Sequence, residues 1–156
     1  MAFSNFTKAF VSIIFNKLYC LGKDNGFGPQ YVWAGSLESG LEVASYDHKP
    51  VMVIIHKSWC PACKKLKSRF AESAEIESLS PHFVMVNLID EEEPKSNTFA
   101  PDGTYIPRIF FVSPTGSVDH DIYNEEGSRQ FKYFYSRPEH IAKSMRKVLQ
   151  KYNKDV

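Results

Sequence analysis

The chain has 156 residues, of which 43% are hydrophobic, and its formal net charge is +1. This length and apolar content predict one globular domain with its own core. The near-neutral charge gives no electrostatic reason to expect binding to nucleic acid or to an anionic membrane surface. Three cysteines are too few for a secreted scaffold held together by disulfides.

The N-terminal segment is the first element with an ambiguous role. Lys8 precedes the apolar run Ala9–Phe15, which is too short to span a bilayer but reaches the lower length limit of a signal-peptide core. We therefore expect residues 1–20 to be a degenerate signal segment and residues 21–156 to form the single domain, with no membrane span. An amphipathic N-terminal segment is the alternative, because no small residues mark a cleavage site near Cys20.

The next stretch leads to the first long helix. Residues 21–29 are rich in Gly and Asn and predict a loop. Tyr31–Trp33 is either a short first strand or an aromatic anchor. Ser36 is a plausible N-cap for a helix that continues to about Tyr46.

The centre of the chain joins a buried strand to a helix. Val51–His56 is an apolar, β-branched run that predicts a strand buried on both faces. A helix is expected from Cys60 to about Ala74, so the Trp-Cys-Pro-Ala-Cys sequence lies where the strand passes into the helix. His56 itself is expected to be a partly buried strand residue with satisfied ring nitrogens rather than a base.

The two cysteines of this junction predict redox chemistry. The first turn of a helix presents unpaired N–H groups and the positive end of its dipole, which favour the reactive thiolate of Cys60. Cys63 lies one turn later on the same face and can close a disulfide with Cys60. Pro61 suits the first helical position, and Lys57 and Lys64 are candidates for stabilising the thiolate by their charge.

Two other interpretations of the cysteine pair are weaker. A structural zinc site needs four ligands, and the only other cysteine is Cys20, while the five histidines show no paired ligand spacing. An inert pair of structural thiols is possible, but Trp59 and the strand-to-helix position argue for an exposed and reactive site. We expect no metal.

The second half of the chain predicts two more strands, a hairpin and a final helix. Phe83–Leu88 is the next strand, and its parallel pairing with Val51–His56 would require a right-handed crossover. Residues 91–105 are polar and predict a long loop, whose acidic triplet is a solvated face or a substrate contact. Ile109–Val112 is a third apolar strand, which a turn at Ser113–Gly116 joins to the next element.

The expected hairpin and the final helix follow this turn. Ser117–Ile122 is expected to return as an edge strand. The aromatic run Phe131–Tyr135 looks exposed, and the last helix starts near Pro138.

This order of elements, with Trp-Cys-x-x-Cys after the central strand and Ile106-Pro107 before a later strand, resembles the thioredoxin fold. Four segments resemble more narrowly the anterior gradient family, small single-domain thioredoxin-like proteins of the endoplasmic reticulum. They are His56–Lys64, Phe83–Leu88, Asp90–Pro94 and Pro101–Arg108. The resemblance implies an α/β fold with a mixed central sheet (βαβαβ-ββα) flanked by helices, and a long loop before a cis-proline at Pro107. An ordinary proline at a strand start is the alternative for Pro107.

The resemblance also implies a function. It implies a thiol–disulfide oxidoreductase of the secretory pathway in which Cys60 and Cys63 are catalytic, with glutathione as redox partner and no metal or organic cofactor. The partners would be client proteins with disulfides or free thiols. The residues that would shape the site and bind substrate are Trp59, Pro61, Ala62, Ile106 and Pro107. The alternative is a non-catalytic binding or chaperone-like module that uses mixed disulfides.

Two departures from the family pattern affect these expectations. Thioredoxins usually carry a buried carboxylate on the central strand six residues before the first cysteine, and this chain has Ile54 there. The tail Asn153–Val156 does not match a retention tetrapeptide. The resemblance implies the endoplasmic reticulum lumen, and because of this tail secretion or a cytoplasmic location are the alternatives.

Overall fold

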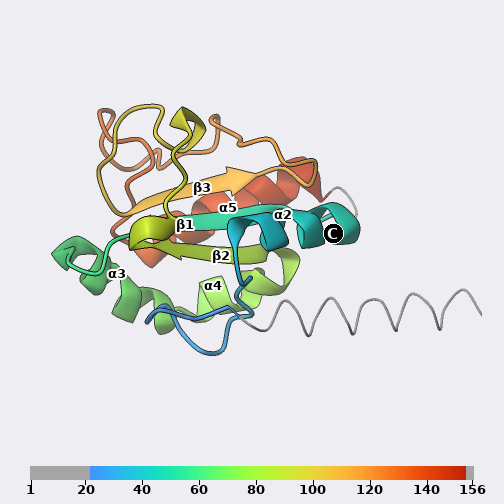
Figure 1. Cartoon of the computed structure of the whole chain (residues 1–156), viewed down its shortest axis with the longest axis horizontal. Helices are drawn as coiled ribbons and strands as arrows, with labels where there is room; N and C mark the ends of the chain where they lie inside the picture. Colours follow the sequence, from blue (N-terminus) through green and yellow to red (C-terminus); the bar gives the residue numbers. More distant parts are fainter. Residues whose placement is uncertain (1–21, 154–156) are drawn as a thin grey trace, which may run out of the picture.

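The computed structural model describes residues 22–153, so the expected signal segment and Cys20 lie outside the described residues. Three 3-10 turns accompany the helices and strands, at Ser80–His82, Asp90–Glu92 and Asn97–Phe99. The helices and strands in chain order (Figure 1) are α2 (Leu37–Asp47), β1 (Val51–His56), α3 (Pro61–Ala71), α4 (Ala74–Leu79), β2 (Val84–Ile89), β3 (Arg108–Val112) and α5 (Pro138–Tyr152). No helix within this part of the chain is long and apolar enough to cross a membrane.

The sheet has three strands in the order β2-β1-β3, and its mixed pairing confirms the predicted fold class. β1 runs parallel to β2, with Val51 opposite Val84, and antiparallel to β3, with Val51 opposite Val112. All six residues of β1 are buried. This agrees with the continuous apolar run of the sequence, because a strand covered on both faces needs no polar alternation.

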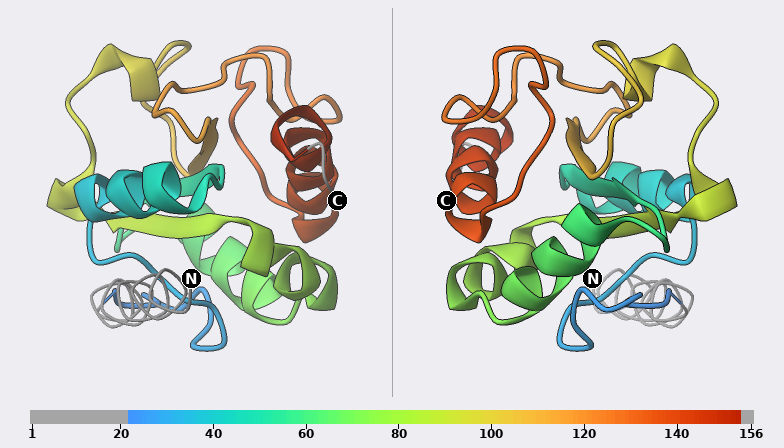
Figure 2. Two further views of the ribbon diagram at one scale, coloured as in Figure 1. Left: turned by 90° about the vertical axis from the view of Figure 1, so that its right-hand side faces the viewer. Right: turned by 90° about the vertical axis from the view of Figure 1, so that its left-hand side faces the viewer.

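Helices cover both faces of this sheet, as Figure 2 shows. Met52 and Ile54 face one apolar cluster, which contains residues of α3 and α5, including Leu66 and Met145. Val53 faces the other cluster, which contains residues of α2. Ser36 caps α2 by accepting a hydrogen bond from Ser39 N, as the sequence predicts.

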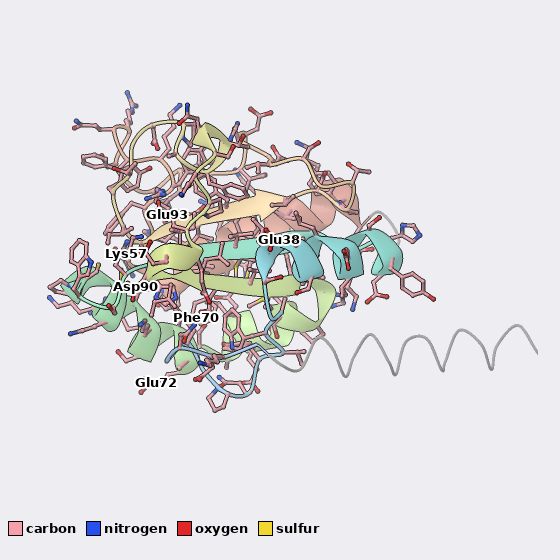
Figure 3. The ribbon with its side chains drawn as sticks, in the orientation of Figure 1. Glu38, Lys57, Phe70, Glu72, Asp90 and Glu93 are labelled. Atoms are coloured by element: carbon pink, nitrogen blue, oxygen red, sulfur yellow. The ribbon has the colours of Figure 1, made fainter. Side chains whose placement is uncertain are left out.

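The segment before α2 is an aromatic anchor with a single bridge to the sheet. Trp33 forms one parallel bridge with Met85. Its Nε1 donates to the Gly28 carbonyl at 3.0 Å, and the Tyr31 hydroxyl donates to the Phe70 carbonyl at 3.1 Å. The rings of these residues pack on Phe70, which projects from α3 toward this segment (Figure 3).

The helix expected from Cys60 to Ala74 is interrupted. Cys60 is its N-cap, the helix begins at Pro61 and ends at Ala71, and α4 starts after a second cap at Ser73. The Ser73 hydroxyl accepts a hydrogen bond from Ile76 N at 3.3 Å. A serine that caps a new helix explains why the first one stops there.

The prediction of an edge strand at Ser117–Ile122 is wrong in its length, because the chain returns beside β3 only as far as Asp119, whose N–H donates to the Phe111 carbonyl at 2.8 Å. Only one bridge, between Val112 and Val118, forms. The carboxylate of the next residue, Asp119, accepts hydrogen bonds from Lys151 Nζ at 2.7 Å and from the Tyr152 hydroxyl at 2.6 Å. Ile122 N donates to the Asp119 carbonyl, so the chain turns toward α5 instead of continuing the ladder.

The aromatic run Phe131–Tyr135 is also less exposed than we expect from the sequence. Tyr133 stacks on Phe110 of β3, with ring centroids 4.6 Å apart, and its carbonyl accepts a hydrogen bond from Ile109 N. Tyr135 is fully buried beside Ser144 of α5. Phe131 alone among the large apolar residues of this run is exposed.

Candidate active site

The two cysteines lie at the start of α3, just after the end of β1. Cys60 has extended backbone angles and caps the helix, and its N–H donates to the Lys57 carbonyl at 3.3 Å. Pro61 occupies the first helical position, where its missing N–H removes a group that would have no partner in the helix. Both cysteines are free thiols and both are buried, Cys60 with 4% of its surface exposed. The exposed thiol pair expected from the sequence is therefore wrong, and the exposed residue at this junction is Trp59.

The two sulfurs occupy different environments. The Cys63 backbone N–H donates to Cys60 Sγ at 3.1 Å, a contact that strengthens when the sulfur carries a negative charge. Cys63 is fully buried. Burial, followed by the hydrogen bond with Cys60, raises the pKa of Cys63 to about 12. The geometry thus favours Cys60 as the nucleophile and keeps Cys63 protonated at rest.

The segment before β3 faces this dithiol. The Ile106–Pro107 peptide bond is cis, as the family resemblance implies. The Ile106 carbonyl oxygen lies 3.9 Å from Cys60 Sγ, and Pro107 is buried behind it. Trp59, directly before Cys60, is 70% exposed. The structure therefore brings together Trp59, Cys60, Cys63, Ile106 and Pro107.

The remaining predicted residues have separate roles. Pro61 and Lys64 are exposed on the first turn of α3, and Ala62 is half-buried. Lys57 is bound to the segment that follows β2, because its Nζ lies 2.6 Å from a Glu93 carboxylate oxygen and donates to the Asp90 carbonyl at 2.8 Å. Its ammonium group thus faces the loop, where Lys57, Asp90 and Glu93 lie near one another (Figure 3), and not the dithiol alone.

A buried arginine completes this ion-pair network, and the sequence analysis missed it. Arg108 has no exposed surface, and it donates to Glu93, to the Phe99 carbonyl and to the Tyr105 carbonyl. Burial would raise the pKa of Glu93, but hydrogen bonds from Lys57 and Arg108 outweigh it and hold the pKa low. An arginine in an apolar strand, preceded by an acidic loop, is the signal that could have indicated this pairing.

Asp90 connects the same loop to Ser58, two residues before Cys60. Its φ is 52°, in the left-handed region that few side chains adopt. Its carboxylate accepts a hydrogen bond from Ser58 N at 2.9 Å, and this bond is the first cause of its lowered pKa. The polar stretch expected as a loop is therefore packed against the reactive end of the sheet.

The prediction that both ring nitrogens of His56 form hydrogen bonds is wrong, because only one of them has a partner. The ring is fully buried, and Nε2 lies 3.1 Å from Asn87 Oδ1. Asn87 Nδ2 donates to the Lys23 carbonyl, so its Oδ1 is an acceptor and His56 Nε2 carries the proton. Nδ1 has no hydrogen-bond partner. Burial lowers the pKa of His56 to about 4, so the ring is neutral at pH 7.

The position of the central strand that carries a carboxylate in thioredoxins is apolar here. Ile54 is fully buried in an apolar cluster. Within residues 22–153, no group of three or more His, Cys, Asp or Glu side chains is arranged to hold a metal ion. The described residues thus place an asymmetric dithiol beside a cis-proline.

Comparisons with known proteins agree with this geometry. A family model described as thioredoxin-like matches residues 32–114. The human anterior gradient protein 2 homolog is 36% identical over 124 residues, which cover 80% of this chain and 70% of that protein. Mouse anterior gradient protein 3 is 36% identical over 125 residues, covering 80% of this chain and 74% of that protein.

A solved structure supports the fold independently. The structure of a thioredoxin from Thermus thermophilus has a TM-score of 0.57 and 22% identity, and the match covers 78% of this chain and 89% of that one. At this identity the likeness concerns the fold alone. The family model and the two relatives show that the chain belongs to the anterior gradient family of thioredoxin-like proteins.

Proposed function

We propose that this protein is a thiol–disulfide oxidoreductase that acts on protein disulfides and dithiols through the Cys60-Pro61-Ala62-Cys63 pair. The observation that carries the proposal is the 3.1 Å hydrogen bond from the Cys63 N–H to Cys60 Sγ at the start of α3. The position of the Ile106 carbonyl beside the same sulfur and the membership of a thioredoxin-like family support it.

The reaction begins with Cys60. Its thiolate attacks one sulfur of a substrate disulfide, an S–S bond forms between Cys60 and substrate, and the substrate S–S bond breaks. The departing substrate sulfur keeps the electron pair as a thiolate. The Cys63 N–H and the α3 N-terminus stabilise the anionic Cys60 before this attack.

Cys63 resolves the mixed disulfide. Its buried thiol loses its proton, for which the departing substrate thiolate is a base formed at the same site. Cys63 then attacks Cys60 Sγ, the Cys60–substrate bond breaks, and the second substrate sulfur leaves with the electron pair. The substrate has gained two electrons and the Cys63 proton, its second thiolate takes a proton from water, and the protein carries a Cys60–Cys63 disulfide. The same steps in reverse oxidise a substrate dithiol.

The partners and location follow from the family and the chemistry. The steps need no metal or organic cofactor, and glutathione is the redox partner we propose for regenerating either state of the pair. Client proteins with disulfides or free thiols are the substrates. Relatives from the anterior gradient family support a place in the secretory pathway, with the endoplasmic reticulum lumen as the location proposed.

A binding module is the second candidate, and one observation favours it. Ile54 is buried where an acid would assist proton transfer from the second cysteine. Slow resolution would prolong mixed disulfides with partners, and the protein would then act by holding them rather than by turnover.

Turnover assays with matched variants test the proposal. The Cys60–Cys63 pair is titrated in glutathione buffers to obtain its potential, and wild type, Cys60→Ser and Cys63→Ser are assayed on a disulfide-bonded protein. We expect Cys60→Ser to abolish exchange and Cys63→Ser to accumulate a mixed disulfide visible by mass spectrometry. Wild-type rates for Cys60→Ser would refute the enzyme. Negligible wild-type turnover, with partner binding kept in both variants, would support the binding module.

A further inference from the structure

Four large apolar side chains are exposed on the described surface. Their exposed fractions are 47% for Val32, 45% for Tyr46, 70% for Trp59 and 40% for Phe131. Trp59 adjoins the dithiol. Phe131 belongs to the segment between β3 and α5, which crosses the β3 side of the molecule (Figure 1), and its ring contacts Tyr105.

We propose that the Tyr105–Phe131 ring pair, together with Trp59, is a docking surface for the polypeptide substrate, which selects cysteines flanked by an aromatic or large aliphatic side chain. This inference rests on the proposed function and specifies its substrate class. The occupant is the extended segment of a client protein on either side of the cysteine that reacts with Cys60.

The ring pair is continuous with the dithiol. The Phe131 ring packs on Tyr105 with centroids 4.9 Å apart and an interplanar angle of 65°. Tyr105 directly precedes Ile106, whose carbonyl lies 3.9 Å from Cys60 Sγ. A substrate held as a mixed disulfide on Cys60 would lie beside the Ile106 carbonyl, with its next side chains directed along this segment toward the ring pair.

Tyr105 is one residue removed from Ile106, so an extended substrate beside this segment would reach the ring pair within a few residues. Such a chain advances about 3.3 Å per residue. The side chains roughly two to four positions from the reacting cysteine would therefore lie over Tyr105 and Phe131. Trp59 lies beside Cys60 and would contact the residue next to the reacting cysteine.

The pair is held rigidly before any substrate arrives. The Tyr105 hydroxyl donates to Asp102 Oδ1 at 2.7 Å and accepts a hydrogen bond from Tyr133 N at 3.0 Å. The other oxygen of Asp102 accepts from Lys132 N, the residue after Phe131, at 2.8 Å. A preorganised aromatic surface loses little conformational entropy on binding, which favours its use in recognition.

The other two exposed side chains offer a matched control. Val32 lines a cavity of about 270 Å³, with Lys49, before β1, and Val84, at the start of β2. Since the dithiol follows the carboxyl end of β1, which is parallel to β2, this cavity lies at the opposite end of the sheet. Tyr46 is as exposed as Phe131 and precedes Asp47, which lines the same cavity.

The test compares peptide selectivity between variants. Wild type, Phe131→Ser, Phe131→Leu and Tyr46→Ser are assayed on two glutathionylated peptides with Phe or Ser three residues from the cysteine, and on glutathione disulfide. We expect wild type and Tyr46→Ser to prefer the Phe peptide about three- to tenfold in kcat/KM. Phe131→Ser should lose this preference through KM, keeping kcat and the glutathione rate, and Phe131→Leu should keep part of it.

Failure of this inference and failure of the proposed function give different results. An unchanged preference in Phe131→Ser, with normal glutathione turnover, would overturn the docking surface alone. Absence of turnover in wild type on every substrate would overturn the proposed function. In that case the two peptides are titrated against wild type and Phe131→Ser by calorimetry. If wild type bound both peptides with equal affinity, the docking surface would be overturned too.

Discussion

The backbone N–H of Cys63 points at the sulfur of Cys60 from 3.1 Å, while the sulfur of Cys63 is buried beneath it. One residue thus stabilises the other's anion, and its own pKa is raised to about 12. We expect iodoacetamide to label the Cys63→Ser variant at Cys60 at least tenfold faster than the Cys60→Ser variant at Cys63.

Mass spectrometry of quenched time points measures this difference. Labelling of both variants in denaturant is the control, since the environments then become equivalent. Equal rates in the folded variants would contradict the asymmetry.

Removing the charge of Glu93 should destabilise the fold. In Glu93→Gln the fully buried Arg108 loses its carboxylate partner, and we expect a loss of about 3 kcal/mol in the free energy of unfolding. Urea denaturation followed by circular dichroism measures it. Glu91→Gln, on an exposed neighbour, should change stability by less than about 0.5 kcal/mol. Similar values for the two variants would show that the network contributes nothing.

His56 should make stability depend on pH. The pKa of His56 is about 4 in the folded protein and 6.5 in the unfolded chain, so the unfolded chain binds the proton more readily. The contribution of neutral His56 is therefore present above pH 6.5 and is lost as the pH falls toward 4, by about 3 kcal/mol in total.

A variant without the imidazole isolates this effect. His56→Gln lacks the titrating group, so the stability difference between wild type and variant should shift in favour of the variant between pH 7 and pH 4.5. Urea denaturation at several pH values gives this difference, in which the contributions of carboxylates cancel. A difference that does not change with pH would refute the assignment.

Phe70 should be a major determinant of stability. Its ring has no exposed surface and packs on Phe27 and Tyr31, with centroids 5.3 and 5.2 Å away. Phe70→Ala should cost about 3–5 kcal/mol, because the transfer energy of the ring and a cavity are added together. Phe131→Ala, which removes a partly exposed ring, should cost about 1 kcal/mol or less by the same urea measurement.

Elements with strong local signals were predictable from the sequence. β1 is a continuous apolar run, α2 has a serine cap, and the final helix begins at Pro138 as expected. The cysteine pair was assigned to a helix start for the same reason, since strand, proline and helix periodicity occur within a dozen residues.

Elements that depend on distant partners were not predictable. The Ser117–Ile122 segment alternates like a strand, but Asp119 turns it toward Lys151 and Tyr152, which lie over thirty residues away. The buried Arg108 and the unsatisfied nitrogen of His56 also depend on contacts with Glu93 and Asn87 across the fold. Local patterns carry no information about such pairings.

The stretch between β2 and β3 contacts the residues around the dithiol at three points. Asp90 binds Ser58, Glu93 binds Lys57, and the Ile106 carbonyl lies beside Cys60. This stretch therefore forms one wall of the reactive centre without supplying a sulfur. Exchanging this stretch between homologues should therefore change the thiol reactivity of Cys60 while the Cys60-Pro61-Ala62-Cys63 sequence stays the same. Divergence among such proteins is thus to be sought in the acidic insert at least as much as in the four residues of the redox motif.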